Sequence, residues 1–124
     1  MSPPAVDDVP AGLPRGFLEP CLLLLLAESP SHGYELLEQL RGLGLTRIDA
    51  AALYRSLRGM DQAGLVECWW EPSQSGPARR TYSLTEAGRE RLGAWGSSLF
   101  EVHRRLGEFL TRFGERPAGD VIPR

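Results

Sequence analysis

The sequence contains no lysine and only two cysteines and two histidines, and these scarcities narrow the classes of protein it can belong to. Cys21 and Cys68 are too few for a disulfide framework, and because each lies in an apolar segment we expect two buried free thiols. No Cys, Asp or Glu stands at metal-ligand spacing around His32 or His103, so no metal site is predicted. All 14 basic residues are arginine, the residue best suited to paired hydrogen bonds with phosphate or guanine, although a bias in genome composition explains this equally well.

Long apolar runs and catalytic motifs are also missing. The run of five leucines at residues 22–26 is far shorter than the roughly 20 residues that span a bilayer. No basic region precedes it as in a signal peptide, so we expect a cytoplasmic protein that does not enter a membrane. There is no Gly-rich phosphate loop after a strand and no nucleophile elbow. The sequence therefore predicts neither an enzyme nor a bound cofactor.

What is present suits one domain with a modest core, since the chain has 124 residues and 42% of them are hydrophobic. The formal net charge is −2, so the total charge does not indicate nucleic-acid binding and the placement of the arginines matters more. Residues 1–16 are rich in Pro, Gly and Asp and are expected to be a disordered arm.

Residues 48–64 are predicted to form one amphipathic helix around which the other elements are organised. Asp49 is a good N-cap, because its carboxylate can accept backbone N–H groups of the first turn. Gly64 is expected to end the helix. The inward stripe, at helical spacing, consists of Leu53, Leu57 and Met60.

The opposite side of this helix combines small residues with arginines. Ala51 and Ala52 would let the backbone approach a DNA groove, while Arg55 and Arg58 would reach phosphates or guanine edges. Tyr54 lies beside the inward stripe, where its hydroxyl reaches a phosphate or its ring serves only in packing. An ordinary surface helix with solvated arginines is the alternative, and the neighbouring elements decide between the two.

Two helices are predicted before this one. Residues 17–28 are apolar on nearly all sides, which indicates a position in the core or at a subunit contact. Ser31 is expected to cap a helix over residues 32–41, and Gly42 and Gly44 to end it. Its predicted inward stripe is Tyr34, Leu37 and Leu40. The short link to the next helix is typical of a helix-turn-helix.

An arginine-bearing hairpin is predicted after the third helix. Residues 65–71 form one expected strand, residues 72–78 the turn, and residues 79–84 the returning strand. Three helices followed by a two-stranded hairpin are the plan of a winged helix-turn-helix, a mainly α (α+β) fold that binds DNA. Arg79 and Arg80 stand at the base of this wing. The residues expected to contact DNA on this reasoning are Arg55, Arg58, Arg79 and Arg80, with Arg47 gripping the backbone from the turn before the helix.

A long final helix is predicted from a Thr85 cap to Gly114, with a heptad stripe too long for so small a domain to cover. The stripe consists of Leu92, Trp95, Leu99, Val102, Leu106, Phe109 and Phe113. We expect this seam to pair with a second copy in a two-fold dimer; folding back on the first helix is the alternative. A ligand that enters the seam would be lined by Trp95, Phe100 and Phe109, for which plain packing is the alternative.

Three blocks of sequence resemble the PadR family of transcriptional regulators. They are ESPSHGYELLEQL at 28–40, AALYRSLRGMDQAGLVE at 51–67 and ARRTYSLTEAGRERL at 78–92, in the family's order. The resemblance covers residues 17–113, and the single final helix is similar to the compact branch of the family. It implies a winged helix-turn-helix domain over residues 17–84, a dimerisation helix over residues 85–113 and a tail over residues 114–124.

The resemblance also implies a function. PadR-like proteins are homodimers that bind inverted-repeat double-stranded DNA, usually as repressors, and many release it on binding a small effector molecule. The positions that correspond to the family's DNA-approaching residues are Tyr34, Asp49, Ala51, Ala52, Tyr54 and Arg55, with Arg79 and Arg80 on the wing. Asp49 departs from the more usual Ser or Thr, and Gly59 from a longer side chain. A rival hypothesis, favoured by the acidic net charge, is a protein–protein module that uses the winged scaffold without binding DNA.

Overall fold

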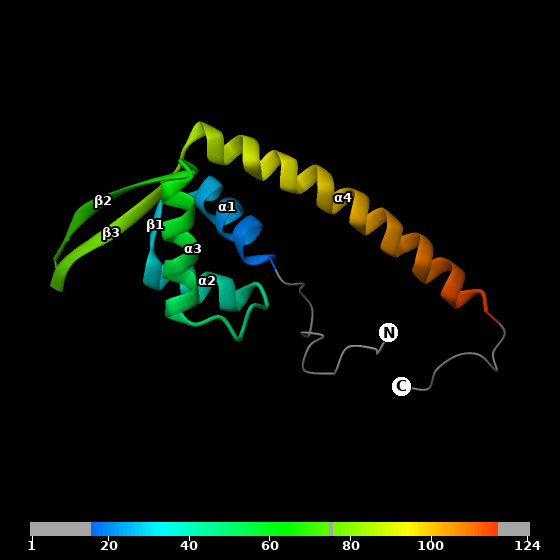
Figure 1. Ribbon diagram of the computed structural model, residues 1–124. Coiled ribbons are helices and arrows are strands. Elements are labelled where there is room, and N and C mark those ends of the chain that lie inside the picture. Colours follow the sequence, from blue (N-terminus) through cyan, green and yellow to red (C-terminus); the bar gives the residue numbers. More distant parts are fainter. Residues whose placement is uncertain (1–15, 75, 117–124) are drawn as a thin grey trace. The chain divides into compact units, whose positions relative to one another are not determined.

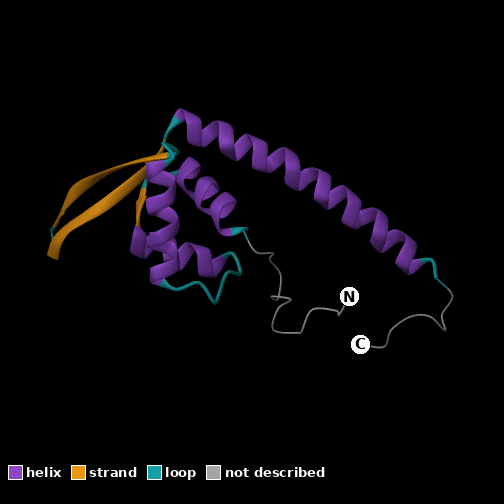
Figure 2. Cartoon of the chain, viewed as in Figure 1, coloured by secondary structure: helices purple, strands orange, loops and turns teal. Residues whose placement is uncertain are grey.

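The computed structural model describes residues 16–74 and 76–116 (Figure 1). The elements in chain order are α1 (Leu18–Glu28), β1 (Ser31–His32), α2 (Gly33–Gly42), α3 (Ala50–Gln62), β2 (Val66–Ser73), β3 (Gly76–Leu84) and α4 (Glu86–Gly114). Figure 2 shows this mixture of helices and one small sheet. The predicted class, a mainly helical winged helix-turn-helix with a long final helix, is confirmed.

The chain forms two compact units that divide within α4, between Leu92 and Gly93, and each unit is described by itself. The predicted N-terminal arm (residues 1–16) lies outside the described residues except for residue 16. The predicted tail (residues 114–124) lies outside them except for residues 114–116.

The core of the first unit is built on α1, which packs against α2 and β3. The leucine-rich helix begins at Leu18, one residue after its predicted start, and most of its circumference is covered. Leu24 is the exception among its leucines, with 45% of its surface exposed. The largest fully buried side chains of the described residues are Leu22, Leu23, Leu26, Leu36, Leu40, Leu53 and Leu57. Three helices therefore share one core, which fixes the orientation of α3.

Helix α2 differs from the prediction at its start. His32, not Ser31, is the N-cap, and Ser31 is buried in β1. Because the helix begins at Gly33, its inward positions fall three, four and seven residues later. The buried stripe is Gly33, Leu36, Leu37 and Leu40. The predicted inward position of Tyr34 is wrong, since 66% of its surface is exposed.

Helix α3 has the predicted caps and the predicted buried face. The Asp49 carboxylate accepts a hydrogen bond from the Ala52 N–H at 2.8 Å. At the other end Gly64 adopts a positive φ of 77°, a conformation that costs a side-chain-bearing residue free energy. The Leu65 N–H then donates to the Met60 carbonyl at 2.9 Å, which satisfies a carbonyl of the last turn. Leu53, Leu57 and Met60 are buried, as the spacing predicted.

The sheet has three strands in the order β1-β3-β2, all antiparallel, rather than the two predicted. Strand β1 pairs Ser31 with Tyr82 and His32 with Thr81, and so ties the start of α2 to the base of the hairpin. Two residues are too short for a strand pattern to be recognised in sequence. The hairpin itself projects beyond the three helices (Figure 1).

The hairpin is longer than predicted, because most of the expected turn at residues 72–78 belongs to the strands. Pro72 and Pro77 lie within the expected turn. Both lie beyond the part of β3 that pairs with β1, where each strand has a free edge and proline is tolerated. The register is irregular between Glu71 and Ser73, on either side of Pro72. The wing is therefore a long two-stranded ribbon with a proline-induced irregularity.

The start of α4 is locked to the end of α3. Thr85 caps α4, as predicted: its Oγ1 accepts from the Gly88 N–H at 3.0 Å and donates to the Gly64 carbonyl at 2.6 Å. Its own N–H donates to the Leu65 carbonyl at 3.0 Å. Gly88 is buried, and a Cβ there would collide with the Leu65 carbonyl oxygen. The Leu-Thr-x-x-Gly block is thus a joint between the hairpin and two helices.

Candidate nucleic-acid interface

The outer face of α3 carries the side chains predicted to approach DNA. Ala51, Arg55 and Arg58 are exposed, and Ala52 is half-buried. Tyr54 is 43% exposed. The small residues lie in the first turn and the arginines one and two turns later. The backbone is therefore accessible at the start of the helix, and positive charge lies at its middle.

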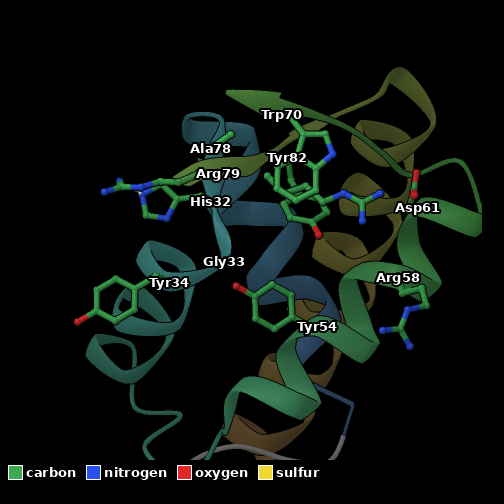
Figure 3. Close-up of a pocket in the computed structure, with 11 residues that line it drawn as sticks. His32, Gly33, Tyr34, Tyr54, Arg58, Asp61, Trp70, Ala78, Arg79 and Tyr82 are labelled. Atoms are coloured by element: carbon green, nitrogen blue, oxygen red, sulfur yellow. Dashed lines mark hydrogen bonds between the residues drawn. The ribbon is translucent and has the colours of Figure 1, made fainter. Parts of the chain in front are cut away.

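A hollow of about 560 Å³ lies between α2, α3 and the base of the hairpin. Five of the predicted DNA contacts line it: Tyr34, Tyr54, Arg58, Arg79 and Arg80. Figure 3 shows Arg58 on α3 and Arg79 on the wing at opposite sides of it. The other predicted contacts do not line it, namely Arg47, Asp49, Ala51, Ala52 and Arg55. The fold thus brings the wing's arginines and the recognition face of α3 to one side of the first unit.

Tyr54 combines the two roles left open by the sequence. Its phenol ring lies against the backbone of Gly33, so closely that a Cβ at Gly33 would overlap its ring and hydroxyl (Figure 3). The ring therefore packs α3 onto the first residue of α2, while part of the side chain stays exposed. The glycine of the His-Gly-Tyr block is required by this close approach.

The two wing arginines have different neighbours. Arg79 Nη1 lies 3.1 Å from His32 Nε2. Arg80 donates from Nε and Nη2 to the Cys68 sulfur at 3.3 and 3.1 Å, and this contact raises the pKa of its guanidinium. Burial raises the pKa of Tyr82, whose ring is 6.0 Å from the Arg80 guanidinium carbon, so its phenol stays neutral at pH 7. The Arg80 guanidinium therefore keeps its full charge.

The two cysteines are free, but only one is buried. Burial raises the pKa of the Cys21 thiol, as expected for a thiol that acts as a core residue. The expectation that Cys68 is also buried is wrong, because it is half-buried on the hairpin. Its sulfur contacts the Asp61 carboxylate of α3 at 3.8 Å and the Arg80 guanidinium at 3.1 Å, and these two side chains cover it only in part.

Trp70 also lines the hollow with 66% of its surface exposed, although the sequence did not assign it to the DNA interface. In the hairpin register Trp70 stands opposite Arg80, on the same face of the ribbon. The predicted strands, which flank the expected turn symmetrically, already place these two residues opposite each other.

Asp49 places a negative charge at the start of the recognition helix, and its two effects can be separated. Asn caps helices about as well as Asp but carries no charge. Asp49→Asn is therefore expected to leave thermal stability nearly unchanged and to strengthen DNA binding about threefold at low salt, with the gain shrinking as salt rises. Asp49→Ala should instead lower the free energy of unfolding by about 1 kcal/mol, because the 2.8 Å cap is lost. Fluorescence anisotropy measures the DNA affinity, and thermal melts measure the stability. Weaker DNA binding by Asp49→Asn would contradict a repulsion between the Asp49 carboxylate and DNA.

The second unit presents an unpaired apolar face along α4. Val102, Leu106 and Phe109 of the predicted seam are exposed, at 47%, 55% and 63%. The ring of Phe109 stacks on that of Phe113 with centroids 6.2 Å apart. Phe100 is 79% exposed and follows Leu99, so it lies about 100° around the helix from that seam position.

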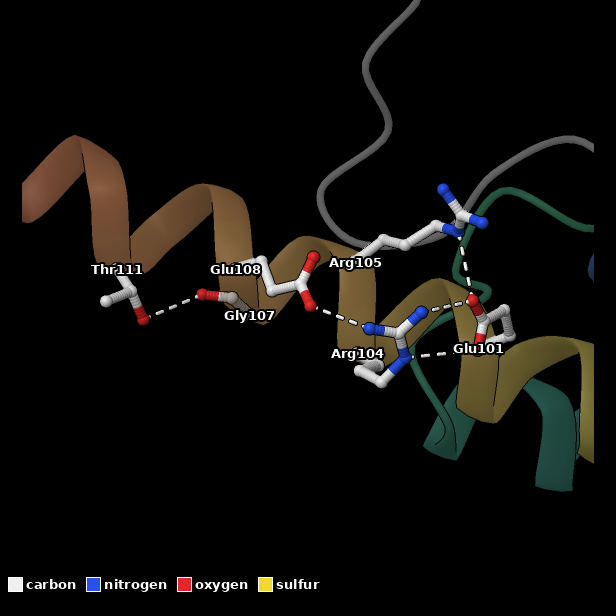
Figure 4. Close-up of polar contacts among 6 residues, drawn as sticks. All are labelled: Glu101, Arg104, Arg105, Gly107, Glu108 and Thr111. Carbon is white, nitrogen blue, oxygen red and sulfur yellow. Dashed lines mark hydrogen bonds and ion pairs between the residues drawn. The ribbon is translucent and has the colours of Figure 1, made fainter.

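The opposite face of α4 is a network of ion pairs. Arg104 contacts Glu101 and Glu108, each at 2.6 Å, and Arg105 contacts Glu101 at 3.1 Å (Figure 4). These pairs are spaced three and four residues apart, as neighbours on one helical face are. The polar and apolar residues of this segment are therefore segregated.

Within residues 16–74 and 76–116, no helix has both the length and the apolar composition needed to cross a membrane. In the same residues no three His, Cys, Asp or Glu side chains lie close enough together to hold a metal ion.

A helix-turn-helix with small residues and arginines on its second helix, followed by an arginine-bearing hairpin on the same side, defines a winged-helix DNA-binding protein. Residues 22–94 match the sequence profile described as "Transcriptional regulator PadR-like family". The chain belongs to this family, and the resemblance found in its sequence is confirmed. It is a DNA-binding transcriptional regulator and not an enzyme, which removes the rival hypothesis of a scaffold that does not bind DNA.

Solved structures agree with this assignment. The chain is 30% identical to a PadR-like transcriptional regulator from Bacillus cereus, with a TM-score of 0.72 over 77% of this chain and 93% of that one. It is 28% identical to a PadR family transcriptional regulator from Eggerthella lenta, with a TM-score of 0.68 over 77% and 83% of the two chains. An uncharacterised protein from Lysinibacillus sphaericus is 24% identical over 98 residues, which are 77% of this chain and 90% of that protein.

Proposed function

We propose that this regulator is a cytoplasmic homodimeric repressor of an inverted-repeat operator. The observation that supports this most directly is the shared side of α3 and the wing, where Arg58, Arg79 and Arg80 surround one hollow. Helix α3 would enter the major groove, and the wing would follow the adjacent phosphates or minor groove. A dimer bound to an operator within a promoter would repress transcription, because it would keep RNA polymerase from the promoter.

Each predicted contact has a role in this proposal. Arg55 and Arg58 read guanine edges or hold phosphates, and the alanines of the first turn allow a close approach. Arg79 and Arg80 hold the backbone from the wing. Tyr34, Arg47 and Tyr54 are placed to donate hydrogen bonds to phosphates beside the groove, because all three are exposed. Residues 17–84 then form the DNA-binding domain.

The dimer in this proposal is formed by residues 85–113. The seam described above, from Leu92 to Phe113, is apolar, and in one chain three of its seven side chains are exposed and four are half-buried, whereas the opposite face is charged. A two-fold partner would cover it with the same surface and hold two α3 helices one DNA turn apart. A small aromatic effector that entered the seam beside Trp95, Phe100 or Phe109 would change this spacing and release the operator.

The DNA contacts are tested by substitution. Selection of bound fragments from genomic DNA should enrich an inverted repeat, and anisotropy titrations on that fragment give affinities at several salt concentrations. Arg55→Ala is expected to weaken binding about tenfold or more and to relax the preference at its base pair. Arg79→Ala is expected to weaken binding to all sequences alike and to reduce the salt dependence by about one phosphate contact.

The matched control is Arg112→Ala, which removes an exposed arginine from the last turn of α4 and should leave DNA binding unchanged. Enrichment of fragments without two-fold symmetry would contradict the dimeric operator. If the Arg55 and Arg79 variants both bind like the parent at every salt concentration, the proposed placement of α3 and the wing is wrong.

A further inference from the structure

The contact between His32 and Arg79 links two parts of the interface that lie 47 positions apart in sequence. His32 is the last residue of β1 and the N-cap of α2, and Arg79 lies on β3, two residues before the partner of His32 in the sheet. Arg79 Nη1 approaches His32 Nε2 to 3.1 Å, and Figure 3 shows the two side chains together at the edge of the hollow.

Glu35 also contacts the imidazole, through its backbone N–H at Nδ1 and through its carboxylate Oε2, which lies 3.6 Å from Nε2. The backbone contact competes with that of Arg79. His32 Nδ1 lies 3.4 Å from the Glu35 N–H, the position of a helix cap. A neutral imidazole has one acceptor nitrogen, and both the guanidinium and the backbone N–H can only donate. Only one of the two hydrogen bonds therefore forms at a time. The Arg79 bond is shorter and has a charged donor, which makes it the stronger of the two.

The geometry also explains why this bond sets the orientation of the Arg79 side chain and does not hold the fold together. Arg79 is exposed, so its side chain is otherwise free to sample many rotamers in water. The His32 side chain is 22% exposed and its backbone is held in the sheet, so it is the fixed partner. Accepting one guanidinium N–H on a fixed ring nitrogen leaves the remaining donors of Arg79 available to a phosphate.

We propose that His32 is the positioning residue that holds Arg79 in its DNA-binding orientation, with Nε2 as the acceptor. The inference rests on the proposed wing contact of Arg79 with the operator backbone. Arg79 then contacts a phosphate with its side chain already ordered. The His32 imidazole links the start of α2 to the wing through this one contact. Loss of Nε2 costs affinity through Arg79 alone.

Two substitutions separate the two nitrogens of the ring. The side-chain oxygen of Asn lies where Nδ1 does, so His32→Asn provides a good N-cap but cannot reach Arg79. The longer Gln places its oxygen near the position of Nε2, so His32→Gln keeps the acceptor for Arg79 without providing a cap. Each variant is compared with the parent, with Arg79→Ala and with the double variant His32→Asn/Arg79→Ala, in the full-length protein.

The DNA is the inverted-repeat fragment that genomic selection recovers with the parent, titrated between 50 and 200 mM salt, where affinity changes steeply. His32→Asn is expected to bind about threefold to tenfold more weakly, with part of the reduction in salt slope that Arg79→Ala shows. The double variant should bind like Arg79→Ala alone. His32→Gln should bind within about twofold of the parent and melt at nearly the same temperature, because the parent imidazole does not accept from the Glu35 N–H while Nε2 accepts from Arg79.

Three results would overturn the inference, and they differ in what they say about the wing. If Arg79→Ala is weak but His32→Asn binds like the parent, Arg79 acts without His32. If His32→Gln is as weak as His32→Asn, an acceptor at Nε2 is not what the site needs. If Arg79→Ala itself binds like the parent, the wing contact of the proposed function fails first and the inference fails with it.

Discussion

Gly88→Ala is expected to lower the free energy of unfolding by about 3 kcal/mol, the upper part of the range for an added methyl group in a packed site. The new Cβ would overlap the Leu65 carbonyl oxygen and approach Leu84 Cδ1 to 2.7 Å. Neither can move cheaply, because that carbonyl also accepts the Thr85 N–H and Leu84 is buried. The joint between α3, the hairpin and α4 must open to admit one methyl group.

Gly93→Ala is the matched control, since it adds the same methyl group to the same helix. Nothing lies within 4 Å of a Cβ at Gly93, and this position is far around the helix from the proposed seam. It should raise stability by up to about 1 kcal/mol, because Ala forms helix better than Gly. Chemical denaturation of both variants measures the difference. Equal free energies of unfolding would show that the contacts around Gly88 can rearrange to admit the methyl group, and that packing does not require a glycine there.

Leu106→Glu is expected to separate the proposed dimer and to weaken operator binding about a hundredfold, the scale of gain that linking two binding modules provides. Leu106 lies near the middle of the seam, and a two-fold partner would bury two introduced carboxylates close together. A fully folded monomer should remain, because Leu106 is 55% exposed in the single chain and contributes little to its core. Sedimentation at micromolar concentration measures the state of assembly.

Ser97→Glu provides the control for charge. It introduces the same side chain on the same helix at an exposed position on the polar side of α4. This variant should sediment and bind like the parent. If Leu106→Glu remains a dimer, the apolar stripe is not the contact between subunits; if it becomes a monomer that still binds the palindrome with parental affinity, dimerisation does not contribute to operator binding.

These predictions concern different kinds of contact, and only some of these contacts could be predicted from the sequence. The stripe through Leu106 is a periodic pattern along one helix, so it could be read without a structure. Gly88 lies in the third block that resembles the family, but the resemblance assigned it no steric role. Its steric role depends on Leu65, which lies in another element, and no local pattern predicts that approach.

In the candidate interface, too, some features could be predicted from the sequence and others depended on the packing of separate elements. The outer residues of α3 follow from the buried stripe, because fixing one face of a helix fixes the other. The wing arginines followed from their place in the expected hairpin. The hollow that gathers Tyr34, Tyr54 and the arginines required the packing of α2, α3 and the sheet. Tyr34 was wrong as an inward residue, because the start of α2 was placed one residue too early, and its contact with DNA stays a prediction.

The sequence by itself determined the helices, the caps of α3 and α4 and the buried face of α3, since spacing and capping act within about one turn and leave a local signature. Asp49, Gly64 and Thr85 are the clearest cases. Tertiary structure alone decided the third strand, the fit of Tyr54 on Gly33, and the meeting of His32 with Arg79 across 47 positions. Such contacts depend on how separate elements pack, and neither periodicity nor turn chemistry encodes the distance between residues on different elements.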